Sequence, residues 1–283
     1  MDSDTHNSGA EFDFEKYSLH DFESWEQTYG GFDMKFKDGT KWEMTERTYN
    51  TALIEDHEVT TAGDYIAQLY QQYHYTADNY FINGGSGGTI IINGESKTIT
   101  TPDPYSGNTL EDDPFTVESP QQTQTVNGRT ITYNFVYWED GSTDNPRNLT
   151  PNNHFDIVAN YKGHMFSNNS YATGYNNGRR IYKSSDGTIY MVYEDNDDIW
   201  FTSSTDGGKT WSKETRLDSN TKTSLNPSIA GTLDMLFVTW FDQTDLNIKL
   251  RRFNINTSQW YNAQTVASVN FGDAIKPAPA IAV

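Results

Sequence analysis

Residues 204–211 read Ser-Thr-Asp-Gly-Gly-Lys-Thr-Trp, and this stretch decides how the C-terminal third of the 283-residue chain is interpreted. An aspartate followed by glycines indicates a tight turn, because its carboxylate accepts hydrogen bonds from backbone N–H groups and glycine adopts positive φ. Residues 198–217 therefore predict a strand, a turn and a second strand, with the tryptophan packed beneath the hairpin.

The pattern around this turn is repeated along the chain. Residues 179–217 predict four short strands, and the same order recurs in residues 226–266. Trp260 repeats Trp211, although the second copy lacks the aspartate and the glycine. A third copy opens at 276–283. A period of about 50 residues with four antiparallel strands in each unit is typical of β-propeller blades.

The turn fits the pattern S-x-D-x-G-x-T-W at all five defined positions, which are Ser204, Asp206, Gly208, Thr210 and Trp211. It resembles the Asp-box of bacterial neuraminidase (BNR) repeats. The resemblance implies that residues 179–283 form two to three blades of an incomplete sialidase-like β-propeller. In that family the Asp-box lies on the outer rim of the propeller, away from the active site, so the resemblance implies a structural role for this turn.

A softer resemblance covers the middle of the chain. Residues 84–94 (GGSGGTIIING) and 135–163 are similar to the divergent B-repeat domains of bacterial surface proteins, which run from a Gly-Gly-Thr opening to a closing tryptophan and tyrosine pattern. The counterparts of the closing pattern are Trp138, Asp140-Gly141, Asn145-Pro146, Thr150, Ala159 and Tyr161. Residues 25–83 carry no such resemblance.

Hairpins account for most of the region before residue 164. Asn-Gly pairs at 93–94 and 127–128 lie between alternating runs, which is a strong hairpin signal. Asp38-Gly39 predicts a third hairpin over 32–44. Residues 63–75 place aromatic side chains on one face at a period of two, which favours a strand over a helix. The whole chain therefore predicts an all-β fold in which a β-sandwich precedes the propeller blades.

The chain divides into four predicted segments. Residues 1–24 predict an acidic disordered tail, because acidic side chains greatly outnumber the single lysine. A β-sandwich or B-repeat-like region follows at 25–163, then a linker at 164–178 rich in Asn, Ser and Gly. The partial propeller occupies 179–283, with blades at 179–217 and 226–266 and the start of a third at 276–283.

The composition limits the classes of partner. The net charge is −19, from 39 acidic and 20 basic side chains, and neither nucleic acid nor an anionic membrane would bind such a chain without a basic patch. No window approaches the roughly 20 apolar residues of a membrane span. The absence of cysteine excludes disulfides and thiolate metal sites. We expect a glycan or protein ligand.

The start of the sequence does not settle the location. Met1 is followed by DSDTHNSG, which lacks the basic and apolar regions of a signal peptide. Either the protein is not exported, or its signal is missing from this sequence. The two family resemblances imply a protein that is secreted or held at the bacterial cell surface.

Sialidase chemistry is only partly represented. The family uses an arginine triad for the substrate carboxylate, a Tyr/Glu nucleophile pair and an acid/base aspartate, and a planar guanidinium suits the first role. The family's first-blade motif matches Arg180, with Arg179 as a neighbouring alternative, followed by a strand that ends near Glu194. Tyr182 replaces the proline of the motif, and the later blades are missing, so we assign no catalytic residue.

Other candidate sites are weaker. Residues 194–198 (Glu-Asp-Asn-Asp-Asp) form an acidic run whose oxygens can bind Ca²⁺, although a solvated loop is the favoured interpretation and we expect no cofactor. The six histidines show no paired metal-binding spacing. Trp25, Trp42 and Trp200 offer rings that stack on sugars, although tryptophans more often pack in cores. Arg180, Glu194 and Trp200 are therefore the candidate ligand-binding residues.

Two hypotheses about function follow. The first is a non-catalytic exported surface or adhesion-type protein whose propeller blades form a binding or scaffolding platform. The alternative is the N-terminal part of a sialidase-like glycoside hydrolase whose catalytic residues lie beyond Val283. An incomplete propeller also presents an open strand edge, which predicts self-association or a poorly ordered C-terminus.

Overall fold

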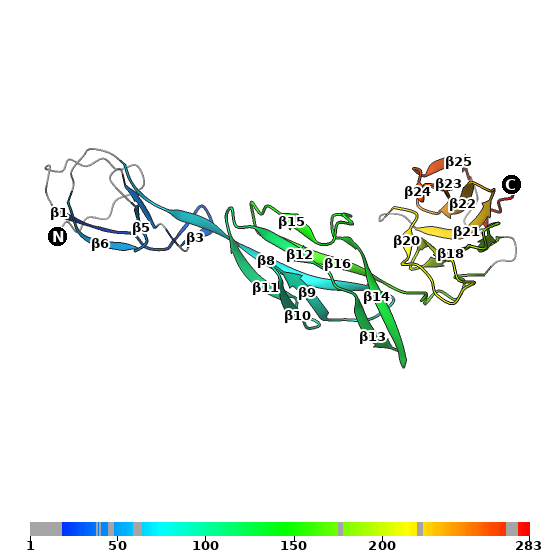
Figure 1. Ribbon diagram of the computed structural model, residues 1–283, viewed down its shortest axis with the longest axis horizontal. Helices are drawn as coiled ribbons and strands as arrows, with labels where there is room; N and C mark the ends of the chain where they lie inside the picture. The colour runs from blue at the N-terminus through cyan, green and yellow to red at the C-terminus, as the bar shows by residue number, and fades with distance from the viewer. Residues whose placement is uncertain are drawn as a thin grey trace. The chain divides into compact units, whose positions relative to one another are not determined.

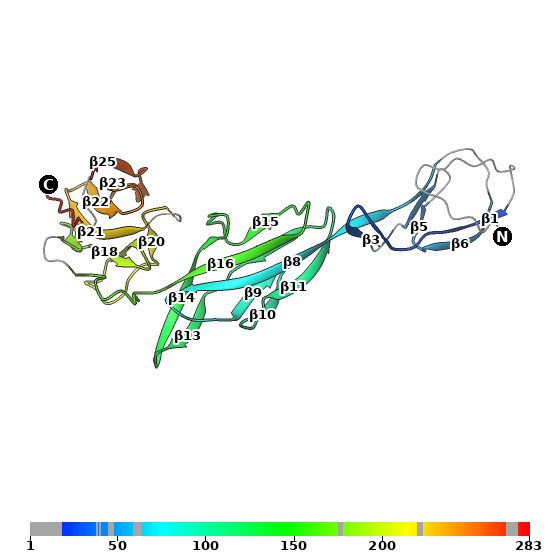
Figure 2. The same ribbon diagram turned by 180° about the vertical axis from the view of Figure 1, so that it is seen from behind.

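A computed structural model describes residues 19–37, 39, 41–44, 48–58, 64–174, 178–219, 223–269 and 277–283. Within these ranges the chain contains strands β1 to β25 and no helix, with strands making up 56% of the structure. The strands form several sheets, none of which is closed. The predicted all-β class is therefore confirmed. Figures 1 and 2 show the strands from opposite sides.

The chain divides into two compact units. One contains the described residues up to Thr76 together with Ser106–Thr116 and Asn148–Asp156. The other contains Ala77–Tyr105, Val117–Arg147 and the chain from Ile157 onward. Strands β8 (Leu69–Ile82) and β16 (Phe155–Gly163) run through both units.

The first described residues already belong to a sheet. Strand β1 (Leu19–Glu23) pairs with β6 (Leu53–Glu58), so the predicted acidic tail is wrong for its last residues, and residues 1–18 lie outside the described part. Short strands β4 (Trp42–Met44), β5 (Thr48–Tyr49) and β7 (Tyr65–Ala67) form a second small sheet. Trp42, Met44 and Ile54 share a small core.

The hairpin predicted over residues 32–44 does not form. Strand β3 (Phe32–Phe36) pairs antiparallel with β8, from Asp33↔Gln72 to Phe36↔Leu69, and β4 continues in the same direction along β7, from Trp42↔Ala67 to Met44↔Tyr65. The pairing direction is the same for β3 and β4, so the chain does not reverse between them, and Gly39 adopts a φ of 107°. The Asp-Gly pair predicts only a residue with positive φ. The direction of the chain through β3 and β4 is set instead by their pairing with β8 and β7.

The middle of the chain contains two larger sheets. One has the order β13-β14-β16-β8-β3-β2, with β11 also paired to β8, and the other has the order β10-β9-β12-β15. The bounds of the strands not yet given are β2 Gln27–Tyr29, β9 Gly88–Ile92, β10 Glu95–Ile99, β11 Tyr105–Leu110, β12 Phe115–Glu118, β13 Gln122–Val126, β14 Arg129–Trp138 and β15 Arg147–Leu149.

Both Asn-Gly hairpins form as predicted. Strands β9 and β10 meet at Ile92↔Glu95, and β13 and β14 meet at Val126↔Arg129, which leaves two-residue turns. Asn93 and Asn127 have φ of 50° and 49°, and the glycine after each is also positive, as a type I′ turn requires. The predicted strand over residues 63–75 is confirmed as β7 and the start of β8.

Two sheets occupy the C-terminal part. The first C-terminal sheet has the order β17-β18-β19-β20, and the second has the order β21-β22-β23-β24, with β25 also paired to β23. Their bounds are β17 Ile181–Lys183, β18 Ile189–Asp195, β19 Asp198–Ser204, β20 Thr215–Arg216, β21 Ser224–Gly231, β22 Met235–Asp242, β23 Asn247–Asn254, β24 Gln259–Trp260 and β25 Gln264–Ser268. The repeated order of strands that the sequence predicts is confirmed.

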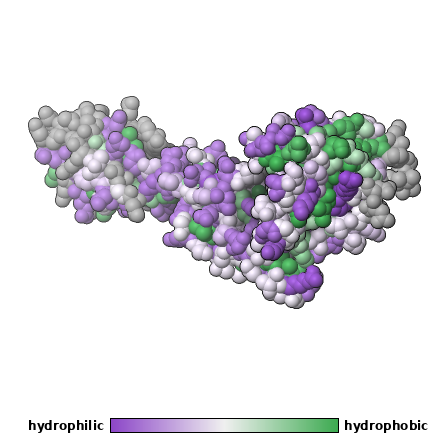
Figure 3. Space-filling view, turned by 45° about the vertical axis from the view of Figure 1, so that its right-hand side comes forward, coloured by the Kyte–Doolittle hydropathy of each residue, from purple (hydrophilic) through white to green (hydrophobic). Residues whose placement is uncertain are grey.

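The two C-terminal sheets share one core. Val192, Ile199 and Phe201 from the first sheet contact Ile229 and Val238 from the second within a single buried cluster. The sheets therefore pack against each other as neighbours (Figure 1). On the outer surface of the C-terminal part, hydrophobic residues lie among hydrophilic ones on the face drawn in Figure 3.

The predicted third copy does not begin with a strand. Residues 277–283 are described and contain no regular strand, whereas residue 276 lies outside the described ranges. This segment instead bonds to side chains of β21, because Asn226 Nδ2 donates to Pro277 O at 2.9 Å and Ile281 N donates to Ser228 Oγ at 3.4 Å. Contacts with side chains replace the backbone ladder that a strand would need.

Candidate functional site

The acidic run at 194–198 ends β18 and begins β19, with an exposed two-residue turn between them. Asn196 and Asp197 adopt φ of 52° and 62° in a two-residue turn, and Asp195 pairs with Asp198 across it. Glu194 is 4% exposed, Asp195 is 0% exposed and Asp198 is 6% exposed. The favoured interpretation as a solvated loop is therefore wrong for these three carboxyl groups, whereas Asn196 and Asp197 are exposed. In the described part of the chain, no group of three or more His, Asp or Glu side chains is arranged to hold a metal ion.

Lys162 lies on β16, a strand of the seven-stranded sheet, and it neutralises the carboxylate of Asp195 at the end of β18. The Lys162 Nζ lies 2.9 Å from Asp195 Oδ2, and the two side chains are 1% and 0% exposed. The same ammonium donates to Gly163 O at 3.0 Å and to Phe166 O. Burial lowers the pKa of Lys162, and the nearby Asp195 carboxylate offsets part of that effect. A buried charge of this kind requires its partner.

Arg216 serves two further carboxylates. Its guanidinium donates to Asp198 Oδ1 and, at 3.1 Å, to Asp218 Oδ1. Burial, with Asp218 alongside, raises the pKa of Asp198 to about 8, and burial also raises the pKa of Asp218. Two buried carboxyl groups beside one cation cannot both ionise freely, so the pair takes up a proton at a higher pH than free carboxyls do.

Arg180 and Glu194 lie together on the other side of β18. Glu194 accepts hydrogen bonds from Asn226 N at 2.9 Å and from Asn169 Nδ2, and burial raises the pKa of its carboxyl. Arg180 is 8% exposed, and its Nη2 donates to Gly174 O at 2.8 Å. Its Nε and Nη1 are buried and have no hydrogen-bond partner among the residues described.

An unsatisfied guanidinium is an unusual feature of a folded protein. Burial lowers the pKa of Arg180, with the charge of Glu194 acting in the opposite direction, yet arginine stays protonated in proteins. Buried donors without partners cost free energy, so such groups indicate a missing ligand or a functional role. A free N–H group on a guanidinium can donate a charge-assisted hydrogen bond to a carboxylate.

Of the three candidate ligand-binding residues, only Arg180 and Glu194 lie at this site in the structure. Trp200 is 0% exposed and packs against Ile82 and Tyr193, with its Nε1 donating to Asp195 O at 3.1 Å. The exposed ring expected for sugar stacking is therefore wrong for Trp200, because the indole fills a core. Trp42 is also buried, whereas Trp25 is 53% exposed.

The turn at 204–211 is organised around one carboxylate. Asp206 accepts hydrogen bonds from Lys209 N at 2.9 Å, from Thr210 N at 2.9 Å and from Thr210 Oγ1 at 2.6 Å. Ser204 Oγ donates to Asp206 at 2.8 Å and accepts from Gly208 N. Trp211 is partly buried, and its Nε1 donates to Gly208 O at 3.2 Å. Each defined position of the motif thus takes part in closing the turn.

The Asp206 carboxyl should titrate at unusually low pH. Hydrogen bonds from Thr210 are the main cause that lowers its pKa to about 2. Since the folded pKa lies below the unfolded one, the turn is stabilised above about pH 4, and this contribution is lost as the pH falls towards 2. We expect carboxyl ¹³C NMR to report the low pKa, and Thr210→Val to raise it. Thr205→Val, in the same turn, serves as the control, and an ordinary pKa near 4 for Asp206 would contradict this account.

Several residues of this region could not be recognised from the sequence. Lys162 follows an alternating run in β16, where a lysine reads as solvent-facing. Glu214 is also buried, and it accepts hydrogen bonds from Met165 N at 2.6 Å and from His164 Nδ1 at 3.1 Å. The one available signal was the density of acidic residues at 194–198, since buried carboxylates need basic partners somewhere in the chain.

No protein-family model, curated protein or solved structure matches this chain. The resemblances to neuraminidase repeats and to B-repeat domains therefore stay predictions. Within the ranges that the structure describes, no helix has the length and apolar character needed to cross a membrane.

Proposed function

We propose that the chain is a non-catalytic binding or scaffolding protein of the bacterial surface, in which sialidase-like propeller blades carry a site for an acidic glycan. Two features support the blades. Each C-terminal sheet has its main strands in chain order, as blades do, and the turn at Asp206 has the hydrogen bonds expected of an Asp-box. The N-terminal and middle sheets would then be the preceding sandwich and B-repeat-like region.

Arg180 is the observation that carries the proposed ligand. Its Nε and Nη1 are buried donors without partners, and the first arginine of the sialidase motif, which it resembles, binds a substrate carboxylate. The adjacent Glu194 accepts hydrogen bonds from Asn169 and Asn226, which holds it beside the guanidinium. A sugar carboxylate would accept a charge-assisted hydrogen bond from one of these two donors of Arg180.

A binding assay with one substitution tests this site. N-acetylneuraminic acid should bind the protein in NMR or calorimetric titrations, and Arg180→Gln should weaken binding roughly 10- to 100-fold, the effect of losing a charge-assisted hydrogen bond of about 1.5–3 kcal/mol. The variant should stay folded, because the substitution removes two unsatisfied donors and one hydrogen bond.

Arg129→Gln is the matched control, because Arg129 is exposed at the start of β14 and its loss should leave binding unchanged. Methyl β-galactoside, which has no carboxylate, should not bind at this site. Equal affinity of the wild type and Arg180→Gln for the acid would reject the proposed site.

The enzymatic alternative has one supporting observation. Burial raises the pKa of Glu194, and a raised carboxyl pKa is a feature of general acid catalysts. The remaining groups of a sialidase would have to lie beyond Val283. Hydrolysis of a fluorogenic sialoside by the natural full-length protein would favour this alternative over the binding platform.

The proposal also covers the location of the protein and its self-association. Secretion or display at the cell surface is supported by the family resemblances alone. Self-association through a strand edge is supported by β25, whose five side chains are all exposed. Exposed strands of this kind pair readily with a strand from another molecule.

A further inference from the structure

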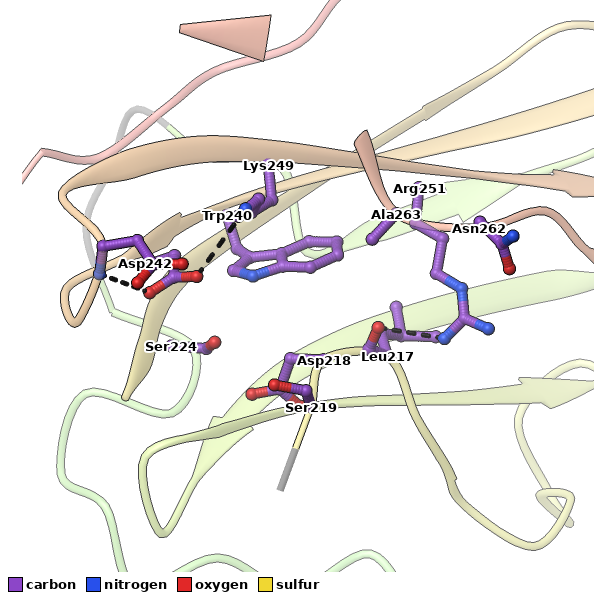
Figure 4. A pocket seen from close by; sticks show the side chains of 11 residues that line it. Leu217, Asp218, Ser219, Ser224, Trp240, Asp242, Lys249, Arg251, Asn262 and Ala263 are labelled. Carbon is purple, nitrogen blue, oxygen red and sulfur yellow. Dashed lines mark hydrogen bonds and ion pairs between the residues drawn. The ribbon is translucent and has the colours of Figure 1, made fainter. Parts of the chain in front are cut away.

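A second site lies between the two C-terminal sheets. A pocket of about 270 Å³ is lined by side chains of β21, β22 and β23 and by the segment after β20 (Figure 4). Asp218, Ser224 and Asp242 lie around the space next to the indole of Trp240 in this view. None of these residues belongs to the Arg180 site.

Two buried polar atoms of the pocket make no hydrogen bond of ordinary geometry, and the Ser224 hydroxyl lies close enough to Asp218 to help lower the pKa of its carboxyl. Ser224 is 1% exposed and the side chain of Asp218 is 2% exposed. Asp218 Oδ1 accepts from Arg216 Nε at 3.1 Å and from Ile199 N at 3.3 Å, whereas Asp218 Oδ2 and Ser224 Oγ make no hydrogen bond of ordinary geometry. Unsatisfied groups facing a polar pocket indicate that a ligand or water supplies the missing bonds.

The charges around the pocket are balanced. Asp218 is paired with Arg216, and Asp242 Oδ2 lies 3.9 Å from Lys249 Nζ. The lining adds one further acid, Asp245, and one further base, Arg251. Arg251 donates to Leu217 O and Tyr261 O, each at 2.9 Å, and so is held by the backbone. With no excess of either charge, the pocket disfavours a strongly charged ligand, because a bound charge would lose its hydration without a free counterion.

The free groups specify hydroxyl chemistry. Asp218 Oδ2 is an acceptor, and Ser224 Oγ both donates and accepts, so neighbouring hydroxyl groups of one ligand can satisfy both atoms. The Trp240 indole supplies an apolar wall of the kind that packs on a sugar ring. The volume of 270 Å³ is slightly below the usual range of about 300–1,000 Å³ for pockets that hold drug-sized ligands, which suits a single ring.

We propose that this pocket binds one neutral sugar unit through Asp218 and Ser224. The site is independent of the acidic-glycan site at Arg180 and does not rest on it. A glycan with both an acidic and a neutral residue would then have two separate points of attachment in the C-terminal part of the chain.

Titrations with methyl glycosides of glucose, galactose, mannose and N-acetylglucosamine test the proposal. At least one glycoside should give saturable shifts of the Ser224 amide and the Trp240 indole N–H in NMR spectra, with a dissociation constant at or below about 1 mM, which is ordinary for a weak small ligand. Ser224→Ala should weaken this binding about tenfold, the effect of losing one neutral hydrogen bond.

The chain offers a matched control for the serine. Thr239 Oγ1 is a second buried hydroxyl without a partner, on the same sheet but outside the pocket lining. Thr239→Val and Ser224→Ala should therefore be similarly stable, and only Ser224→Ala should lose sugar binding. Arg180→Gln should leave the neutral sugar bound, which separates this result from the acidic-glycan test.

Three outcomes would overturn the proposal. The first is that none of the four glycosides gives saturable shifts. The second is that the shifts persist unchanged in Ser224→Ala. The third is that ethylammonium or acetate, added alone, occupies the pocket more tightly than any glycoside, which would assign the site to an ion.

Discussion

Replacing Lys162 by methionine should lower the free energy of unfolding of the second unit by about 3–5 kcal/mol, the cost of leaving one member of a buried ion pair without its partner. The Asp195 carboxylate is fully buried and would keep only the hydrogen bonds from Asn83 and Asn168. Hydrogen exchange of the β18 and β19 amides would measure the loss, because the change acts directly on these strands.

A surface ion pair provides the control for Lys162. Lys97 Nζ lies 2.5 Å from Glu95, whose side chain is 75% exposed, and Lys97→Met should change stability by less than about 1 kcal/mol. Adding Asp195→Asn to Lys162→Met should recover part of the loss, since the uncompensated charge is removed. Equal effects of Lys162→Met and Lys97→Met on stability would contradict the role given to the buried Lys162–Asp195 ion pair.

Arg216→Met should be comparably destabilising, by about 3–5 kcal/mol, because it leaves two carboxyl groups buried without their shared cation. The side chains of Arg216 and Asp198 are each 8% exposed, and that of Asp218 is 2% exposed. Without the guanidinium the pKa of both carboxyls should rise further. The loss in Arg216→Met should therefore grow as the pH rises and shrink towards acid, as urea unfolding at several pH values would show.

The wild-type protein should show a weaker form of the same pH dependence. The folded pKa of Asp198, about 8, lies above its unfolded value near 4, so the folded state binds more protons between these values. The contribution of Asp198 to stability is therefore fully present below about pH 4 and is lost as the pH rises towards 8. Asp198→Asn should remove this slope, whereas Arg129→Met, at an exposed site, should not change it.

Local sequence signals predicted the elements that depend on local geometry. The Asn-Gly pairs at 93–94 and 127–128 require positive φ at both turn residues, and few other residue pairs allow it, so both hairpins could be located. The Asp38-Gly39 pair carries a similar signal in the sequence. In the structure, however, β3 pairs with β8 and β4 pairs with β7 in the same direction, so no hairpin forms. The partner strand lies some 30 residues away and cannot be inferred from the turn itself.

The candidate site was harder to predict because its partners are distant in sequence. Asp195 and Asp198 read as solvated, since an acidic run is usually a surface loop. Their cations, Lys162 and Arg216, come from β16 and β20, and pairing with them permits burial. Arg180 was named from a family resemblance, but its unsatisfied donors are a property of the packing and have no sequence signal.

A crystal structure of the protein soaked with N-acetylneuraminic acid tests the central claim most directly. We predict two adjacent C-terminal sheets of four main strands, with the ligand carboxylate bonded to Nε or Nη1 of Arg180. A structure in which these two nitrogens bond to protein groups, with no acid bound beside Glu194, would contradict the proposed binding platform.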